Sequence, residues 1–410
     1  MRALHTADWH IGQTLNGWSR EAEHEVFLGA VADILEAEEI DLLLVAGDVF
    51  DNTNPSGESQ RLLYRALAEF KRRRPKLTVV ISGGNHDPAL RLEAPGDLIE
   101  AFDIHTIGTV RRKAGEIDLD AHLVPVPGAH GAPAAYVLAI PFLRAADLTG
   151  ISFSADAQDR SIIEAARRFH AELTDAAAAR VGDLPLIATG HLHCAGGIES
   201  EGAERRILIG GAHAVPPDIF PERLDYVALG HLHGPQNLAG GRLRYAGSCF
   251  PLSASEIRYR HGVTILDIDG RTITSTQRDI PWPAPVQRIP ETGVTDLAGL
   301  EAALADIEAG IVPDLVPDLR PLVYVELVAE DAPAVVLGKA EALLREAPVR
   351  PAGLRIHRPE TRAADDAAPA AVPLSETDPE TLFGAAFEAQ NGFAPEARHL
   401  AAFRDALGEV

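Results

Sequence analysis

The sequence predicts an α/β fold with a largely parallel sheet at its centre. Apolar runs of strand length alternate with amphipathic helical segments over positions 2–82, an order that is typical of parallel β-α-β units. Short polar blocks follow these runs, at the strand ends where an open α/β sheet builds its site. The chain has 410 residues, more than one hydrophobic core usually organises, so we expect two or three domains.

The part of the chain up to Asp279 is expected to form two packed sheets. Strand, helix, strand, helix and strand open the chain, which implies right-handed crossovers and parallel pairing. A later helix precedes a fourth apolar strand, and short β runs then dominate; we expect these runs to form a second sheet packed on the first, with helices outside. The expected elements are strand 2–7, helix 20–39, strand 42–46, helix 57–73, strand 77–82, helix 161–180, strand 186–189 and β runs 206–209, 226–229, 243–246, 263–268 and 272–277.

A proline-rich segment at 281–285 predicts the end of this first domain, 1–281. Residues 282–358 have the pattern of a small α+β unit. Residues 359–373 contain almost no large apolar side chains and predict a linker before the last segment, 374–410. The elements expected in the small unit are strands 286–289, 322–328 and 354–357 and helices 297–308 and 334–346.

Two amphipathic helices are predicted behind this linker, over residues 379–390 and 395–407. Such a hairpin is typical of a docking element, so we expect its apolar faces to bind a partner protein. The alternative is that the hairpin packs back on its own chain. The candidate partner-binding residues are Leu382, Phe383 and Phe387 in the first helix and Leu400 and Phe403 in the second.

Composition and charge exclude several classes of protein. The polar, charged N-terminal residues and the lack of any apolar run long enough to cross a bilayer argue against a signal peptide and a membrane span. Two cysteines are too few for a disulfide framework, so we expect a cytoplasmic protein. The net charge of −23, with 22 acidic and 10 basic residues from position 282 onward, argues against nucleic-acid binding by the whole surface. If the substrate is DNA, bound cations and a partner must supply the attraction.

Five short polar blocks carry the residue types of a metal site. They are Asp8-Trp-His10, Gly47-Asp48-Val-Phe-Asp51, Gly84-Asn85-His86-Asp87, Gly190-His191-Leu-His193 and Gly230-His231-Leu-His233. Carboxylate, amide and imidazole ligands without thiolate suit Mn²⁺, Fe²⁺ or Zn²⁺ better than Mg²⁺ or Ca²⁺. Two such ions about 3.5–4 Å apart supply the hydroxide and the positive charge that phosphoester hydrolysis needs. The blocks therefore predict a metal-dependent phosphoesterase.

Positions within the blocks indicate separate roles for the metal ligands. Asp48, at a strand end, is the best candidate to bridge two ions. Asp8 and His10 lie two apart on an extended segment and can therefore share one ion. The plain alternative for both aspartates is a helix cap or a turn. The remaining candidate ligands are Asn85, His191, His231 and His233.

His86 lies beside a proposed ligand and projects to another side of its loop. We expect it to donate a proton to the leaving oxygen or to stabilise charge on phosphorus, with no part in holding metal. Asp87 is expected to orient His86 or to raise its pKa. Asp51 is expected to fix its loop by hydrogen bonds. For His193 two readings stay open: contact with metal or substrate, or a place beside the site.

The five blocks resemble the signature D-x-H, G-D-x-x-D, G-N-H-[DE], G-H, G-H-x-H of the calcineurin-like metallophosphoesterases. Within that superfamily the flanking residues are most similar to the nuclease subunits of double-strand-break repair complexes. The stretches that carry this resemblance are 4–13, 19–24, 45–51, 140–144, 187–192 and 225–233.

The resemblance implies a fold of two mixed β-sheets in a sandwich flanked by helices, with an α+β capping and DNA-recognition domain and a C-terminal helical hairpin. It implies an Mn²⁺-dependent nuclease of repair, recombination and replication: a 3′–5′ exonuclease on duplex DNA and an endonuclease on hairpins and single strands. It also implies a homodimer within a heterotetramer whose SMC-like ATPase is gripped by the hairpin. The implied ligands are Asp8, His10, Asp48 and His233 for one ion and Asp48, Asn85, His191 and His231 for the other, with His86 as the catalytic histidine.

Two observations qualify that implied function. The chain has no G-x-x-x-x-G-K-[ST] motif, so any ATP dependence must reside in another polypeptide. The same metal chemistry also serves a hydrolase of small phosphoesters, and a scaffold that holds DNA ends is a third reading.

Overall fold

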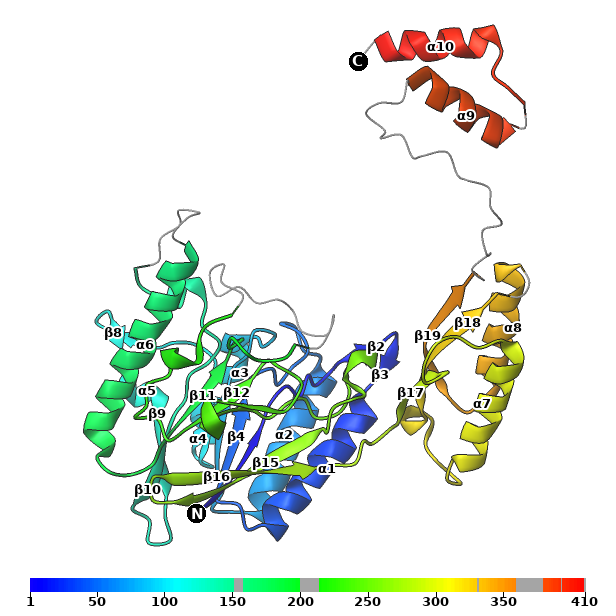
Figure 1. The fold of residues 1–410 in the computed structure, drawn as a ribbon. Helices are drawn as coiled ribbons and strands as arrows, with labels where there is room; N and C mark the ends of the chain where they lie inside the picture. Colours follow the sequence, from blue (N-terminus) through cyan, green and yellow to red (C-terminus); the bar gives the residue numbers. More distant parts are fainter. Residues whose placement is uncertain (151–157, 200–213, 330–331, 359–378, 392, 409–410) are drawn as a thin grey trace. The chain divides into compact units, whose positions relative to one another are not determined.

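The computed structural model describes residues 1–150, 158–199, 214–329, 332–358, 379–391 and 393–408. It divides into two compact units, residues 1–358 and 359–410. The larger unit contains two six-stranded sheets with helices on their outer faces (Figure 1). In the described parts of the chain, no helix combines the length and apolar character needed to cross a membrane.

The first sheet has the strand order β16-β15-β1-β4-β5-β6. Its strands β1, β4, β5 and β6 pair in parallel, as the alternation of strands and helices predicts. The bounds are β1 Arg2–Thr6, β4 Leu42–Ala46, β5 Thr78–Ser82, β6 Ile104–Ile107, β15 Gly262–Asp269 and β16 Thr272–Asp279.

The last two of these strands correct a prediction. We expected the runs 263–268 and 272–277 in the second sheet, and this is wrong because β15 pairs antiparallel with β1. β15 is buried along most of its length, whereas β16 alternates between exposed and half-buried residues, which is the pattern of a solvated edge strand. The expected run 206–209 lies outside the described residues.

The second sheet has the order β13-β14-β12-β11-β10-β9. The strands β9 and β10 were not predicted from the sequence. β9 contains Pro125 and Pro127, and proline argues against a strand except at a sheet edge, which is where β9 lies. The bounds are β9 Leu123–Pro127, β10 Pro133–Leu138, β11 Leu186–His191, β12 Tyr226–Gly230, β13 Gln236–Leu238 and β14 Leu243–Tyr245.

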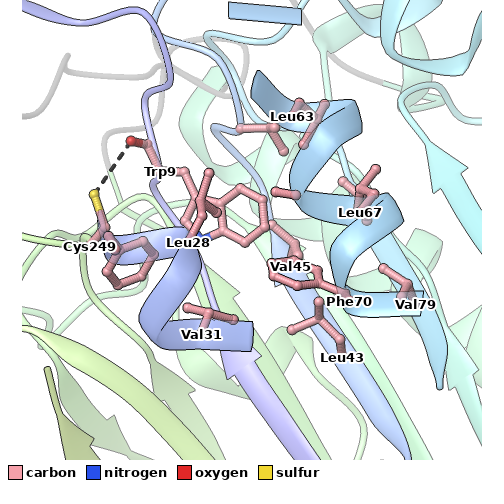
Figure 2. Packing of buried hydrophobic residues seen from close by; sticks show 14 of the residues in the cluster. Trp9, Leu28, Val31, Leu43, Val45, Leu63, Leu67, Phe70, Val79 and Cys249 are labelled. Atoms are coloured by element: carbon pink, nitrogen blue, oxygen red, sulfur yellow. Dashed lines mark hydrogen bonds between the residues drawn. The ribbon is translucent and has the colours of Figure 1, made fainter. Parts of the chain in front are cut away.

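Apolar side chains on both faces of each sheet explain the stacking. In β4, Leu43 and Val45 point to a cluster shared with the helices α1 (Glu21–Ala37) and α2 (Gly57–Arg73) (Figure 2). The alternate residues Leu42 and Leu44 point to the second sheet. The helix α6 (Gln158–Val181) covers the outer face of that second sheet. The short helices are α3 Ala89–Glu93, α4 Gly96–Glu100 and α5 Leu119–His122.

Residues 286–357 form a parallel sheet of three strands, β17-β18-β19. The helices α7 and α8 pack on it through an apolar cluster. β19 begins four residues earlier than we expected, because Pro351 and Gly353 obscure its strand pattern. The bounds are β17 Val286–Ile289, α7 Leu297–Gly310, β18 Leu322–Val328, α8 Pro333–Glu346 and β19 Arg350–His357.

The smaller unit contains the two predicted helices, α9 (Pro379–Asn391) and α10 (Ala397–Gly408). Phe383 stacks on Phe403 with ring centroids 4.3 Å apart, so part of the apolar face is used between the two helices. Leu382 stays 40% exposed. The hairpin therefore has an internal aromatic contact and retains an exposed apolar residue.

Candidate metal centre

The five polar blocks converge where strand ends of the two sheets meet. Asp8, Asp48 and Asn85 follow β1, β4 and β5 of the first sheet, whereas His191 ends β11 and His231 follows β12 of the second. Contacts between β4 and both β11 and β12 bring these strands together. Each sheet thus supplies part of the site.

The backbone at this junction is strained. Asp8, His10, Asp48 and His231 have φ angles of 51°, 48°, 49° and 97°, in the left-handed region that residues other than glycine rarely adopt. Such conformations cost free energy and persist where the surrounding fold imposes them, most often at functional sites. Four of the predicted ligands therefore share this rare backbone conformation.

Asp48 lies at the centre of the predicted ligands. Its Oδ2 atom is 3.2 Å from Nε2 of His191 and 3.7 Å from Nε2 of His10. The other imidazole nitrogen of His191, Nδ1, is 4.0 Å from Oδ1 of Asp8, and Nε2 is 2.9 Å from Oδ1 of Asn85. These side chains come from four of the five blocks. All of them are buried except Asn85, which is half-buried.

Three sets of side chains could each hold a metal ion. Within each set, the ligand atoms lie within 4.8 Å of one another. Asp8, His10 and Asp48 each belong to two of these sets, so the sets overlap in one cluster. The sets are Asp8, His10 and His233; Asp8, Asp48 and His191; and His10, Asp48 and His86.

Two buried atoms in this centre make no hydrogen bond to the described residues. They are Oδ2 of Asp8 and Nε2 of His10. Leaving a carboxylate oxygen and an imidazole nitrogen buried and unpaired is costly, and a cation between them would remove that cost. The donor set of carboxylate, amide and imidazole therefore fits divalent metal ions.

The charges around Asp48 shift its titration. Burial opposes its ionisation, yet the imidazoles of His191, His10 and His86 hold the pKa of Asp48 well below its ordinary value. Burial likewise disfavours the charged form of His191, but the carboxylate of Asp48 raises the pKa of His191 to about 9. Asp8 differs, since burial raises the pKa of its carboxyl.

His231 and His233 bring the second sheet to the site. The backbone N–H of His231 donates to Oδ1 of Asp8 at 2.9 Å, and the rings of His231 and His191 lie 5.4 Å apart. The His233 ring lies 5.2 Å from the ring of His10. Both residues are 5% exposed, so they face the centre and not the solvent.

Glu256 is a residue of the site that sequence analysis missed. Its buried carboxylate places Oε1 2.9 Å from Nδ1 of His233, while Oε2 accepts from the N–H of Leu252 at 3.0 Å and the hydroxyl of Ser248 at 3.2 Å. Burial opposes ionisation, but His233 lowers the pKa of Glu256 to about 2. A carboxylate on Nδ1 fixes the orientation of a histidine ring, which is how the partner of a metal-binding histidine typically acts. No motif marks this glutamate, because it follows His233 by 23 residues.

His86 is oriented by the backbone. Its Nδ1 lies 2.7 Å from the carbonyl oxygen of Asp51, and its own N–H donates to Oδ1 of Asp48 at 2.8 Å. A carbonyl only accepts, so Nδ1 carries the hydrogen. The His86 ring lies 4.8 Å from the ring of His10. The carboxylate of Asp51 lies 3.3 Å from Nδ1 of His10.

Asp87 differs from its predicted role. Its buried carboxylate accepts backbone hydrogen bonds from Gly84 at 2.8 Å, Phe50 at 2.8 Å and Val49 at 3.1 Å. Burial, followed by the nearby Asp48, raises the pKa of Asp87 to about 6. Asp87 therefore ties the β4 and β5 loops together, and the bond that orients His86 comes from the Asp51 carbonyl instead.

His193 lies beside the centre and not among its closest atoms. Its Nδ1 is 2.9 Å from Oε1 of Glu199, and its side chain is 13% exposed. This pairing is in keeping with the reading of His193 as a neighbour of the site.

Comparisons with known proteins agree with this geometry. The profile of the Calcineurin-like phosphoesterase family matches residues 1–235. The SbcD protein of the nuclease SbcCD from Rhodobacter capsulatus is 54% identical over 393 residues, which cover 94% of each chain. The SbcD proteins of Bacillus subtilis and Escherichia coli are 37% and 34% identical over 65% and 74% of this chain, and over 66% and 73% of their own length. The chain therefore belongs to the calcineurin-like phosphoesterases and, among them, to the SbcD family of nuclease subunits.

Proposed function

We propose that this phosphoesterase hydrolyses phosphodiester bonds of DNA with two divalent ions, Mn²⁺ in the cell. The observation that carries the proposal is that two buried atoms, one on Asp8 and one on His10, make no hydrogen bond to the described residues and lie beside the Asp48–His191 pair. The printed names of its relatives describe nuclease subunits, which supports DNA as the substrate. Exonuclease action in the 3′–5′ direction on duplexes and endonuclease action on hairpins or single strands are part of this proposal.

Each proposed ion has four ligands, with Asp48 shared. When bound, the ions supply positive charge at the phosphate and lower the pKa of a water molecule. The chain's own part is to hold these ligands in strained but fixed backbone positions and to keep His233 aligned through Glu256. The proposed ligands are Asp8, His10, Asp48 and His233 for one ion and Asp48, Asn85, His191 and His231 for the other.

His86 is the proposed proton donor. The Asp51 carbonyl fixes the ring of His86 through Nδ1, and a protonated His86 would give its Nε2 proton to the leaving oxygen of the DNA strand. Proton transfer by a positioned side chain of this kind contributes about 10²–10⁴-fold to a rate.

The surface of the chain supports a need for help in binding DNA. The basic run Lys71–Lys76 is the strongest cluster of positive charge in the sequence, but its arginines face acids. Arg73 pairs with Asp33 and Glu69, and Arg74 lies 3.5 Å from Asp41. We therefore propose that the ions and a SbcC-like ATPase, docked on the α9–α10 hairpin, supply the attraction that this acidic chain lacks.

We also propose a homodimer. Leu98 and Phe102 are 69% and 58% exposed, and they line an apolar groove of about 580 Å³ with Tyr64, Leu67 and Ile99. Exposed apolar patches of this kind mark interaction surfaces. In the proposed assembly two copies of this chain join two ATPases as a heterotetramer in the cytoplasm.

A nuclease assay tests the proposal. The full chain is incubated with 5′- and 3′-end-labelled duplex DNA and Mn²⁺, with and without the ATPase, and Asp48→Asn serves as the control. We expect cleavage that needs metal and Asp48. A chain that cleaves small phosphodiesters fully without a partner, and never DNA, would instead be the small-phosphoester hydrolase considered above. A pull-down with and without residues 374–410 tests the docking.

A further inference from the structure

Three buried charged side chains lie outside the metal centre and take no part in the proposed chemistry. Arg20 and Glu23 have no exposed surface, and Arg350 is 1% exposed. The Arg20 guanidinium donates two hydrogen bonds of 2.6 Å to the Glu23 carboxylate. Arg350 donates another, of 2.9 Å, to the same carboxylate. We call these residues the Arg20–Glu23–Arg350 cluster.

Stability alone does not account for this cluster. Two cations share one carboxylate, and Nη1 of Arg350 is buried with no partner among the described residues. Removing charges from water is so costly that apolar side chains of similar volume often serve a core as well or better. The attested use of such buried ionic contacts is to fix one arrangement of two segments.

The cluster joins segments that are distant in the sequence. Arg350 is the first residue of β19, and its Nε donates to the carbonyl of Arg320 at 2.8 Å, just before β18. Glu23 lies in the first turn of α1, 327 residues before Arg350. The carboxylate of Glu23 is thus linked, through the guanidinium of Arg350, to the starts of both β18 and β19.

The same cluster reaches a proposed metal ligand. Arg20 donates to the carbonyl of Pro251 at 3.0 and 3.1 Å and lies 4.6 Å above the ring of Phe250. The next residue, Leu252, donates its N–H to Glu256, which holds His233. A continuous set of hydrogen bonds therefore runs from β19 to the segment 250–256.

A second route leads to the first polar block. The carbonyl of Arg20 lies 2.8 Å from Nδ1 of the buried His24, and Nε2 of His24 lies 2.6 Å from the carbonyl of Trp9. Trp9 stands between Asp8 and His10, two proposed ligands. Both routes begin at Arg20, whose position depends on Glu23.

We propose that Arg350 is a positioning residue that couples the placement of the 282–358 unit, through Glu23 and Arg20, to the segment that holds His233. The consequence for DNA rests on the proposed function. A duplex that contacts both the 282–358 unit and the metal centre depends on this coupling, whereas a small phosphodiester contacts the centre alone.

Hydrogen–deuterium exchange on the full chain tests the coupling without any reaction. Arg350→Met removes the guanidinium, and Arg355→Met is the matched control, because Arg355 lies on the same strand with a side chain 80% exposed. We expect peptides covering 250–256 to exchange about tenfold faster in Arg350→Met than in the unaltered chain. In Arg355→Met their exchange rate should be unchanged. Arg350→Lys should restore part of the protection of these peptides against exchange. If Arg350→Met does not fold, Arg350→Lys is compared with the unaltered chain instead. Faster exchange confined to 322–328 and 350–357, or none at all, overturns the coupling.

Steady-state kinetics tests the consequence. For Arg350→Met we expect kcat/KM on duplex DNA to fall about tenfold more than kcat/KM on bis(p-nitrophenyl) phosphate, chiefly through KM. An equal loss on both substrates contradicts a positioning role. If the unaltered chain cleaves no DNA, the proposed function fails, while the exchange experiment still decides the coupling.

Discussion

The substitution Glu256→Gln changes the hydrogen-bonding groups of the buried side chain while nearly keeping its shape. It therefore tests both roles of the carboxylate, which are to orient His233 and to accept from Leu252 and Ser248. The carboxylate accepts from His233 on one oxygen and from Leu252 and Ser248 on the other. Glutamine has one acceptor oxygen and one donor NH₂ group. Whichever way the amide turns, one of these neighbouring donors meets an N–H group and loses its acceptor.

The size of the effect follows from this mismatch. A buried donor left without an acceptor costs about 1–3 kcal/mol of folding free energy. Loss of the partner that orients a metal-binding histidine typically lowers metal affinity about 10–100-fold, which is about 1.4–2.8 kcal/mol of binding free energy. We therefore expect Glu256→Gln to fold, to melt at a lower temperature and to bind Mn²⁺ more weakly.

Isothermal titration of chelator-treated protein with Mn²⁺ measures this affinity. Glu199→Gln is the matched control, because Glu199 also pairs with a histidine, His193, at 2.9 Å, but its side chain is 44% exposed. The control should bind Mn²⁺ as the unaltered chain does. Unchanged affinity in Glu256→Gln would refute the argument that Glu256 aligns His233 for metal.

Three further predictions concern other parts of the chain. His86→Ala should bind Mn²⁺ normally in the same titration while kcat falls about 10²–10⁴-fold; normal cleavage would remove His86 from the mechanism. Asp48→Ala should leave less than one ion per chain by elemental analysis, and two retained ions would exclude bridging. Burial lowers the pKa of His170 to about 4, so the stability from its neutral form is present above the unfolded pKa of about 6.5 and is lost as pH falls toward 4. In urea unfolding, the titration of His170 should lower the free energy of unfolding by about 2 kcal/mol between pH 7 and pH 5. The variant His170→Leu lacks this titration, so its free energy of unfolding should fall by about 2 kcal/mol less over the same pH range.

The sequence predicted elements whose pattern is local. The helix at 57–73 and the strands 42–46 and 322–328 have the expected bounds, because hydrophobic periodicity and capping act within a few residues. The N-cap Ser56, which accepts from the N–H of Ser59, is one such local signal. The family assignment was predictable for a similar reason, since five short blocks carry it.

Features that depend on distant contacts were not predictable. β15 belongs to the first sheet because it pairs with β1, where Arg2 lies opposite Asp267. Glu256 and Arg350 have no motif, and only the folded chain brings them to His233 and Glu23. Asp87 was placed correctly in its loop, but hydrogen bonds to the backbone of another loop decide its role.

The sheet topology also has a consequence for synthesis on the ribosome. β1 emerges first, yet the neighbour that covers its outer edge, β15, is completed only at Asp269. His231, whose N–H binds Asp8, likewise emerges 223 residues after it. The nascent chain therefore has neither a complete first sheet nor all of the proposed ligands until His231 and β15 have left the exit tunnel, so an unfinished chain cannot assemble the proposed metal centre.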